Sequence, residues 1–164
     1  MTLIIILILV FIIALLYFIH HDKLMFIETK LEVIEEKLNS ILIKRREIIK
    51  DSENEIKELV KTKKSIYQDF DEIDGKDIDM FELDKKLQVY KNEFYLILDK
   101  YEVLKNDDEF QKIAFSLSET SDKLETYRRY YNKYAESYNK AIKSFPIFFT
   151  NLIKGRKKKE FFDI

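Results

Sequence analysis

Residues 110–145 read FQKIAFSLSETSDKLETYRRYYNKYAESYNKAIKSF, and this stretch decides the fold. Counting back in sevens from Phe145 gives only large apolar or aromatic residues: Tyr138, Tyr131, Leu124, Leu117 and Phe110. The interleaved positions are mostly small: Ala114, Ser121, Arg128, Ala135 and Ile142. Large side chains facing small ones let helices approach closely. The pattern predicts one long helix with a coiled-coil-like seam. It must stop before Pro146, because the residue preceding a proline is pushed out of the helical conformation.

The composition also favours helices. The chain has 164 residues with only two glycines and one proline, so few residues interrupt an element. Lys and Arg total 29 and Asp and Glu total 30, a balance that argues against a nucleic-acid partner. The absence of cysteine excludes disulfides and thiolate metal sites. We therefore predict an all-α protein.

Residues 3–19, LIIILILVFIIALLYFI, form an unbroken apolar run. At 1.5 Å per residue this run is about 26 Å long, close to the ~30 Å hydrocarbon thickness of a bilayer. It lacks the basic n-region and small-residue cleavage site of a signal peptide. We expect residues 1–21 to be an uncleaved single-pass anchor in the cell membrane, with the lipid bilayer as the partner of residues 3–19.

The residues that follow the run indicate the orientation of the chain in the membrane and include two candidate metal ligands. No Lys or Arg precedes the run, whereas Lys23, Lys30 and Lys37 follow it, so the positive-inside rule places the soluble part in the cytoplasm. His20 and His21 diverge by about 100° on a helix and would present poorly to one ion. We interpret them as an interfacial pair, and we expect no metal and no cofactor.

Three further helices are predicted. Apolar residues spaced three or four apart from Leu24 to Ile66 predict a first helix that continues from the anchor and ends within residues 69–79, around Gly75. A second helix is expected from a possible N-cap, Asp77, to Tyr101. A turn over residues 105–110 leads into the seam helix, and Pro146 can begin a short final helix.

The chain should then divide into an anchor (1–21), a helical bundle (22–155) and a basic, aromatic tail (156–164). If the helices alternate in direction, the seam helix, about 55 Å long at 1.5 Å per residue, ends far from the anchor. The basic run KGRKKK at 154–159 is then expected in solvent, with a protein partner or another membrane as alternatives.

Three stretches carry a resemblance to a known family. Residues 119–146, ETSDKLETYRRYYNKYAESYNKAIKSFP, are similar to the late motif ETxxRIxxxRRFYNxxVxxYNxxIxxFP of the LemA family of bacterial membrane-anchored helical proteins. YEVLKNDDEF at 101–110 resembles the family's YPDLKxNxxF, and LIKRREIIKDSENEI at 42–56 resembles LxRRxDLIPNLVETV. The chain departs from the family at Lys50-Asp51, where relatives have Pro-Asn, and in lacking Trp. The resemblance implies an antiparallel four-helix bundle and no settled biochemical activity.

The candidate interaction residues come from these motifs: Lys44, Arg45, Arg128, Arg129, Tyr131, Asn132, Tyr138, Asn139, Phe145 and Pro146. Asn132 and Asn139 each follow a seam tyrosine, so they lie on one helix edge. They either satisfy backbone groups and fix register or form a surface for a ligand or partner. We expect Lys44, Arg45 and Arg46 to be exposed or to pair at the bundle flank, and Arg128 to pair there with a carboxylate.

Catalysis would need convergent carboxylates or histidines, a glycine-rich phosphate loop or an activated nucleophile, and the sequence offers none. We interpret the protein as a non-enzymatic, membrane-tethered scaffold or adaptor that acts through unidentified protein partners. A membrane-anchored sensor that binds a small ligand or ion along the Tyr-Asn edge is the alternative, and a hydrolase that uses surface carboxylates is a third hypothesis. The sequence leaves the oligomeric state open.

Overall fold

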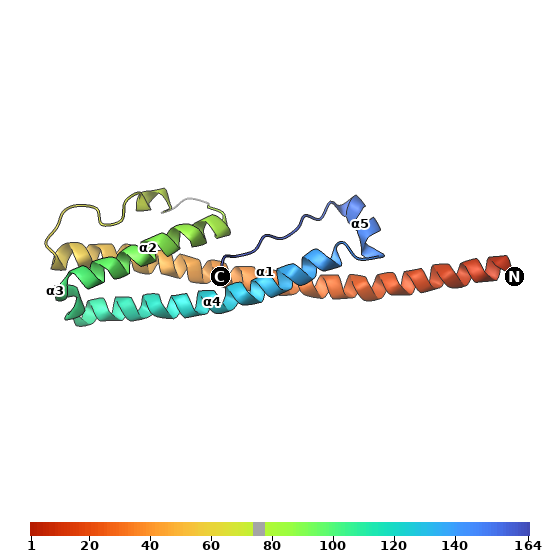
Figure 1. Cartoon of the computed structure of the whole chain (residues 1–164), viewed down its shortest axis with the longest axis horizontal. Helices are drawn as coiled ribbons and strands as arrows, with labels where there is room; N and C mark the ends of the chain where they lie inside the picture. Colours follow the sequence, from red (N-terminus) through yellow and green to blue (C-terminus); the bar gives the residue numbers. More distant parts are fainter. Residues whose placement is uncertain (74–77) are drawn as a thin grey trace. The chain divides into compact units, whose positions relative to one another are not determined.

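The computed structural model describes residues 1–73 and 78–164 (Figure 1). Its elements are α1 (Thr2–Leu59), the 3₁₀ turn η1 (Phe70–Glu72), α2 (Met80–Lys100), α3 (Glu102–Lys105), α4 (Asp108–Ala141) and α5 (Ile147–Lys154). These described residues contain no strand, so the predicted all-α helical bundle is confirmed. The predicted loop centre, Gly75, and the predicted N-cap, Asp77, lie outside the described residues.

The chain forms two compact units, and α1 and α4 contribute residues to both. Unit 1 comprises residues 1–36 and 128–164, and unit 2 comprises residues 37–127. Each unit has its own buried apolar residues and its own polar cluster, and each is described by itself.

In unit 2, α1 ends at Leu59 rather than within residues 69–79. The N–H of Thr62 donates to the carbonyl of Lys57 (3.1 Å) and the N–H of Lys61 donates to that of Glu58 (3.3 Å). Together with the left-handed conformation of Lys61 (φ 57°), these bonds form a Schellman motif that closes the helix. The apolar spacing that continues to Ile66 predicted a longer helix because Lys gives no sign of a left-handed turn.

The segment after α1 returns along it. The hydroxyls of Ser52 and Tyr67 lie 2.8 Å apart, and Arg46 donates to the carbonyl of Ile73 (3.1 Å). Lys86 then lies near Glu72 (3.8 Å) and Tyr90 donates to the carbonyl of Gln68 (3.1 Å). Through this segment, Lys86 of α2 lies level with Arg46 of α1, and Tyr90 of α2 lies level with Ser52 of α1. The two helices therefore run in the same direction (Figure 1).

Helix α4 runs opposite to its neighbours in unit 2. Phe94 of α2 stacks on Phe110 of α4, with ring centroids 5.2 Å apart. Asp107 caps α4 by accepting from the N–H of Phe110 (2.8 Å), and Asp79 caps α2 by accepting from the N–H of Phe81 (2.9 Å). The expected strict alternation of direction is thus wrong at one step, because residues 60–73, which contain only the short 3₁₀ turn η1, return along α1 before α2 begins.

In unit 1 the predicted seam is largely confirmed. Its buried apolar residues come from α1 and α4: Leu24, Ile27, Leu31, Ile34, Tyr131, Ala135, Tyr138 and Ile142. Phe145 is an exception, with 55% of its surface exposed. Its predicted place in the seam is wrong because α4 ends at Ala141, so the helical period no longer applies.

The end of α4 lies beside the N-terminal part of α1. Phe145, Pro146 and Phe149 line one hollow together with α1 residues between Val10 and Phe18. The prediction that the seam helix ends far from the apolar run is therefore wrong. Among the described residues, α1 is the one helix long and apolar enough to cross a membrane, and its apolar stretch is exposed.

Candidate functional site

The Asn edge of α4 holds the C-terminal segment of the chain. Asn132 Nδ2 donates to the carbonyl of Phe162 and its Oδ1 accepts from the N–H of Phe162, both at 2.8 Å. Asn139 makes the same pair of bonds with the backbone of Lys159, at 2.9 and 2.8 Å. Each side-chain amide thus pairs with one residue of a non-helical segment, here called the C-terminal strap (residues 156–163).

The strap begins where Gly155 ends α5. Gly155 adopts a left-handed conformation (φ 62°), which glycine reaches without steric cost, and its N–H donates to the carbonyl of Asn151 (2.8 Å). The Asn151 side chain then accepts from the N–H of Arg156 (3.1 Å). These contacts turn the chain out of α5 and into the strap (Figure 1).

Phe162 is the apolar anchor of the strap. Its ring meets Tyr131 edge to face, with centroids 5.1 Å apart, and the residue is buried while its neighbour Phe161 is exposed. Burial of an aromatic ring of this kind contributes roughly 1.5–3 kcal/mol. The strap is therefore held by an apolar contact as well as by its backbone.

Two ion pairs attach the basic part of the strap to α1 in the same unit. Arg156 Nε lies 2.9 Å from Glu28 Oε1, and Lys159 Nζ lies 2.7 Å from Glu35 Oε1. Burial raises the pKa of the nearby Tyr138 phenol, and Glu28 adds to this while Arg156 and Lys159 oppose it. The expectation that the basic tail lies in solvent is wrong for these two residues, since their charges have partners on α1.

Arg45 forms the polar centre of unit 2. It is 1% exposed, and it donates to Ser121 Oγ (2.7 Å), Thr120 Oγ1 (3.4 Å) and Gln88 Oε1 (3.5 Å). Arginine's planar group offers five donors, which suits a position among several acceptors. The prediction of an exposed or flank-pairing residue is wrong for Arg45, because acceptors on α2 and α4 surround it.

The other basic candidates are less enclosed. Lys44 and Arg129 are exposed, and Arg128 is half-buried. Arg46 donates to the backbone of Ile73, as described above. The structure thus brings Tyr131, Asn132, Tyr138 and Asn139 together around the strap, and it places Arg45 in a separate cluster.

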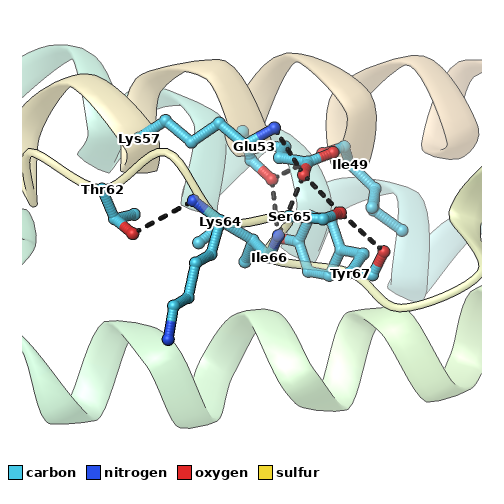
Figure 2. Close-up of polar contacts among 9 residues, drawn as sticks. Ile49, Glu53, Lys57, Thr62, Lys64, Ser65, Ile66 and Tyr67 are labelled. Carbon is cyan, nitrogen blue, oxygen red and sulfur yellow. Dashed lines mark hydrogen bonds and ion pairs between the residues drawn. The ribbon is translucent and has the colours of Figure 1, made fainter.

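A second polar cluster in unit 2 was not predicted (Figure 2). Glu53 Oε1 accepts from the N–H of Ile66 (2.9 Å) and from Ser65 Oγ (3.0 Å), and it pairs with Lys57 (2.8 Å). Burial alone would raise the pKa of Glu53, but these bonds outweigh it and hold the pKa below its ordinary value. Glu53 therefore fastens the segment that follows α1. Its only sequence signal was the Glu53–Lys57 spacing on the helix.

Tyr67 closes this cluster. Its hydroxyl lies 2.8 Å from Ser52 Oγ, and its ring packs against Phe70 and Tyr90. Burial raises the pKa of Tyr67 above its ordinary range, with the bond to Ser52 opposing and the charges of Glu53 and Glu93 adding to the effect. A tyrosine held neutral in this way is a hydrogen-bonding core residue rather than an activated base.

No group of three or more His, Cys, Asp or Glu side chains in the described part of the chain could hold a metal ion. What these residues do chemically is bind other parts of the same chain. The arrangement defines a class of protein: a long-helix bundle that carries an exposed apolar N-terminal helix and a C-terminal strap clasped by side-chain amides.

The comparison with family models agrees with this architecture. The model of the LemA family matches residues 35–164, and the chain belongs to that family. The match runs through the strap and leaves out residues 1–34, which include the whole apolar stretch of residues 3–19. No curated protein and no solved structure matches the chain.

Proposed function

We propose that this LemA-family chain is a non-enzymatic, membrane-tethered scaffold or adaptor that acts through protein contacts. The observation that carries the tether is the surface of α1. Residues 3–16 are exposed and wholly apolar, and the same helix continues without a break into the bundle. Such a surface is stable in hydrocarbon and unfavourable in water.

The Asn edge is occupied by the chain's own strap, which argues against its use by a small ligand. Both polar atoms of Asn132 and of Asn139 bond to the strap. A small molecule would have to displace four hydrogen bonds and the buried Phe162 ring to reach these amides. A ligand that binds through these amides therefore requires release of the strap.

Unit 2 offers apolar side chains for a partner. Leu96 of α2 and Phe115 of α4 are 70% and 72% exposed. Contact with a partner would remove these apolar side chains from water, which favours association. These residues are where contact with a partner is best tested.

The tether is tested by membrane fractionation of the full chain. We expect it to resist carbonate extraction, and a variant that lacks residues 2–21 to be released. Recovery of the full chain in the soluble fraction would contradict the tether. A reporter fused after Ile164 then tests the cytoplasmic orientation, which would be wrong if the reporter is active outside the cell.

The scaffold is tested by photo-crosslinking in membranes from residues 96 and 115, with the exposed Val89 position of α2 as a matched site. We expect one reproducible adduct of fixed size from position 96 or 115. A thermal-shift screen of small ligands on the same protein separates the sensor alternative, because a ligand that binds the native state raises its melting temperature. A ligand that raises the melting temperature of the native chain but not that of Asn139→Ala would contradict the scaffold proposal and support the sensor alternative.

A further inference from the structure

Helix α5 is an apolar helix whose face the protein leaves uncovered. Ile147 is buried, whereas four of the other large side chains are exposed: Phe148, Phe149, Leu152 and Ile153. Ile153 alone is 88% exposed. An eight-residue helix with this surface is unfavourable in water, so something apolar is expected to cover it.

The position of α5 in unit 1 indicates what covers it. Phe145, Pro146 and Phe149 share a hollow of about 480 Å³ with Val10, Ile13, Ala14, Tyr17 and Phe18 of α1. These α1 residues belong to the apolar run of residues 3–19. Val10 lies nine residues before the end of that run, about 14 Å along the helix axis. If the run lies in hydrocarbon, the hollow and the start of α5 lie at the same depth.

A second hollow adjoins the first on the polar side, since Ser144 lines one and Phe145 lines the other. It measures about 450 Å³, and its lining combines apolar side chains with the ammonium groups of Lys23 and Lys140, the His20 ring and the hydroxyls of Tyr134, Ser137 and Ser144. Lys140 also pairs with Glu136 (2.6 Å). Ammonium and hydroxyl groups just beyond the end of an apolar run suit the phosphate of a lipid headgroup.

The residues after α5 extend this charge pattern. Arg156 and Lys159 turn inward to Glu28 and Glu35, while Lys154, Lys157 and Lys158 are exposed. A short apolar helix followed directly by exposed lysines is typical of segments that insert their apolar face into an anionic membrane surface.

We infer that α5 is inserted in the bilayer beside α1 and that the two hollows hold one anionic phospholipid, with an acyl chain against Phe145 and Phe149 and its phosphate near Lys23 and Lys140. This inference rests on the proposed membrane tether. On this inference the protein contacts the bilayer through both α1 and α5, and the site at α5 prefers an anionic lipid.

The absence of tryptophan from the chain allows a direct test. Phe149→Trp, in the full chain reconstituted into vesicles, places a single fluorophore on α5. Bromine atoms on lipid acyl chains quench tryptophan only by close contact. We expect quenching of this variant, as for Leu9→Trp in the apolar run, and no quenching of Phe115→Trp in unit 2. Leu152→Trp provides a second reporter on α5 if the first variant does not fold.

Lipid selectivity is tested in equimolar vesicles of phosphatidylglycerol and phosphatidylcholine in which one lipid or the other carries the bromines. We expect Phe149→Trp to be quenched more strongly, on the order of twofold, when the anionic lipid is brominated. Lys23→Gln with Lys140→Gln should abolish that preference, whereas Lys112→Gln, an exposed change in unit 2, should keep it.

The outcomes separate the inference from the tether. Quenching of Leu9→Trp without quenching of either α5 reporter leaves the tether standing and overturns the insertion of α5. Equal quenching by the two brominated lipids overturns the anionic selectivity. Absence of quenching at Leu9→Trp contradicts the tether itself.

Discussion

The two units use polar side chains between packed segments in different ways. In unit 2, Arg45 bonds to side chains of neighbouring helices, whereas in unit 1 the Asn edge bonds to the backbone of a non-helical strap. Helix α4 supplies partners in both cases, with Thr120 and Ser121 in one and Asn132 and Asn139 in the other.

The difference follows from what each neighbour can offer. A helix has already used its backbone N–H and C=O groups internally, so it meets its neighbours with side chains only. An extended segment presents a free donor and a free acceptor at each residue, and each needs a partner when it packs against protein. A carboxamide carries both functions in one plane, which is why Asn suits the strap and Arg suits the space between helices.

The largest expected effect is the loss of stability on replacing Arg45 in unit 2. Arg45→Ala removes a fully enclosed side chain and leaves Gln88, Thr120 and Ser121 without their donor. We expect a loss of about 3–5 kcal/mol in the free energy of unfolding, from lost packing and unsatisfied polar groups. Denaturant unfolding of the full chain in detergent, followed by circular dichroism, measures it.

Lys44→Ala is the matched control, because this neighbouring side chain is exposed, and it should change the free energy by no more than about 0.5 kcal/mol. Equal effects of the two substitutions would mean that Arg45 is not the polar centre of the unit.

A smaller effect is expected from the apolar anchor of the strap. Phe162→Ala should cost about 2–3 kcal/mol locally, since the ring is buried against Tyr131. Protease sensitivity of residues 156–164 should rise while α4 stays folded. Phe161→Ala changes an exposed ring and should leave the cleavage rate near that of the native chain. An unchanged cleavage rate in Phe162→Ala would mean that this ring does not hold the strap.

The third effect depends on pH. Because the folded-state pKa of Glu53 lies below its ordinary value of 4.5, its charged form contributes stability above that pH and loses it as the pH falls through the folded-state pKa. Glu53→Gln should destabilise unit 2 by about 1–2 kcal/mol at neutral pH, through weaker bonds to Ile66 and Ser65.

The difference between Glu53→Gln and the native chain should shrink as the pH is lowered from 7 towards 3. Thermal unfolding across this range measures it, with Glu58→Gln as the exposed control on the same helix. A difference that stays constant with pH would show that the carboxylate charge does not fasten the segment.

The sequence predicted the elements that depend on periodicity. The seven-residue spacing identified the seam from Phe110 to Tyr138, and the single proline marked the start of α5. It failed at Phe145 and at Leu59, because helix ends depend on local backbone turns. Lys61 takes its left-handed conformation through hydrogen bonds that no residue type announces.

The sequence left open whether Asn132 and Asn139 satisfy backbone groups or form a binding surface, and in the structure both amides bond to backbone groups. The repeated Tyr-Asn pairs were correctly placed on one edge, yet nothing in their spacing shows that residues 159 and 162 return to meet them. Contacts between positions 20 or 30 residues apart depend on tertiary packing. Arg45 was misjudged for the same reason, since its acceptors come from distant parts of the chain.

The central claim is that Asn132 and Asn139 clasp the strap, and amide hydrogen exchange tests it most directly. The N–H groups of Lys159 and Phe162 should exchange slowly in the full native chain. In the Asn132→Ala, Asn139→Ala double variant they should exchange about tenfold faster or more, since the opening free energy falls with each lost bond, while Lys133→Ala should have no effect. Rapid exchange of both amides in the native chain would contradict the account.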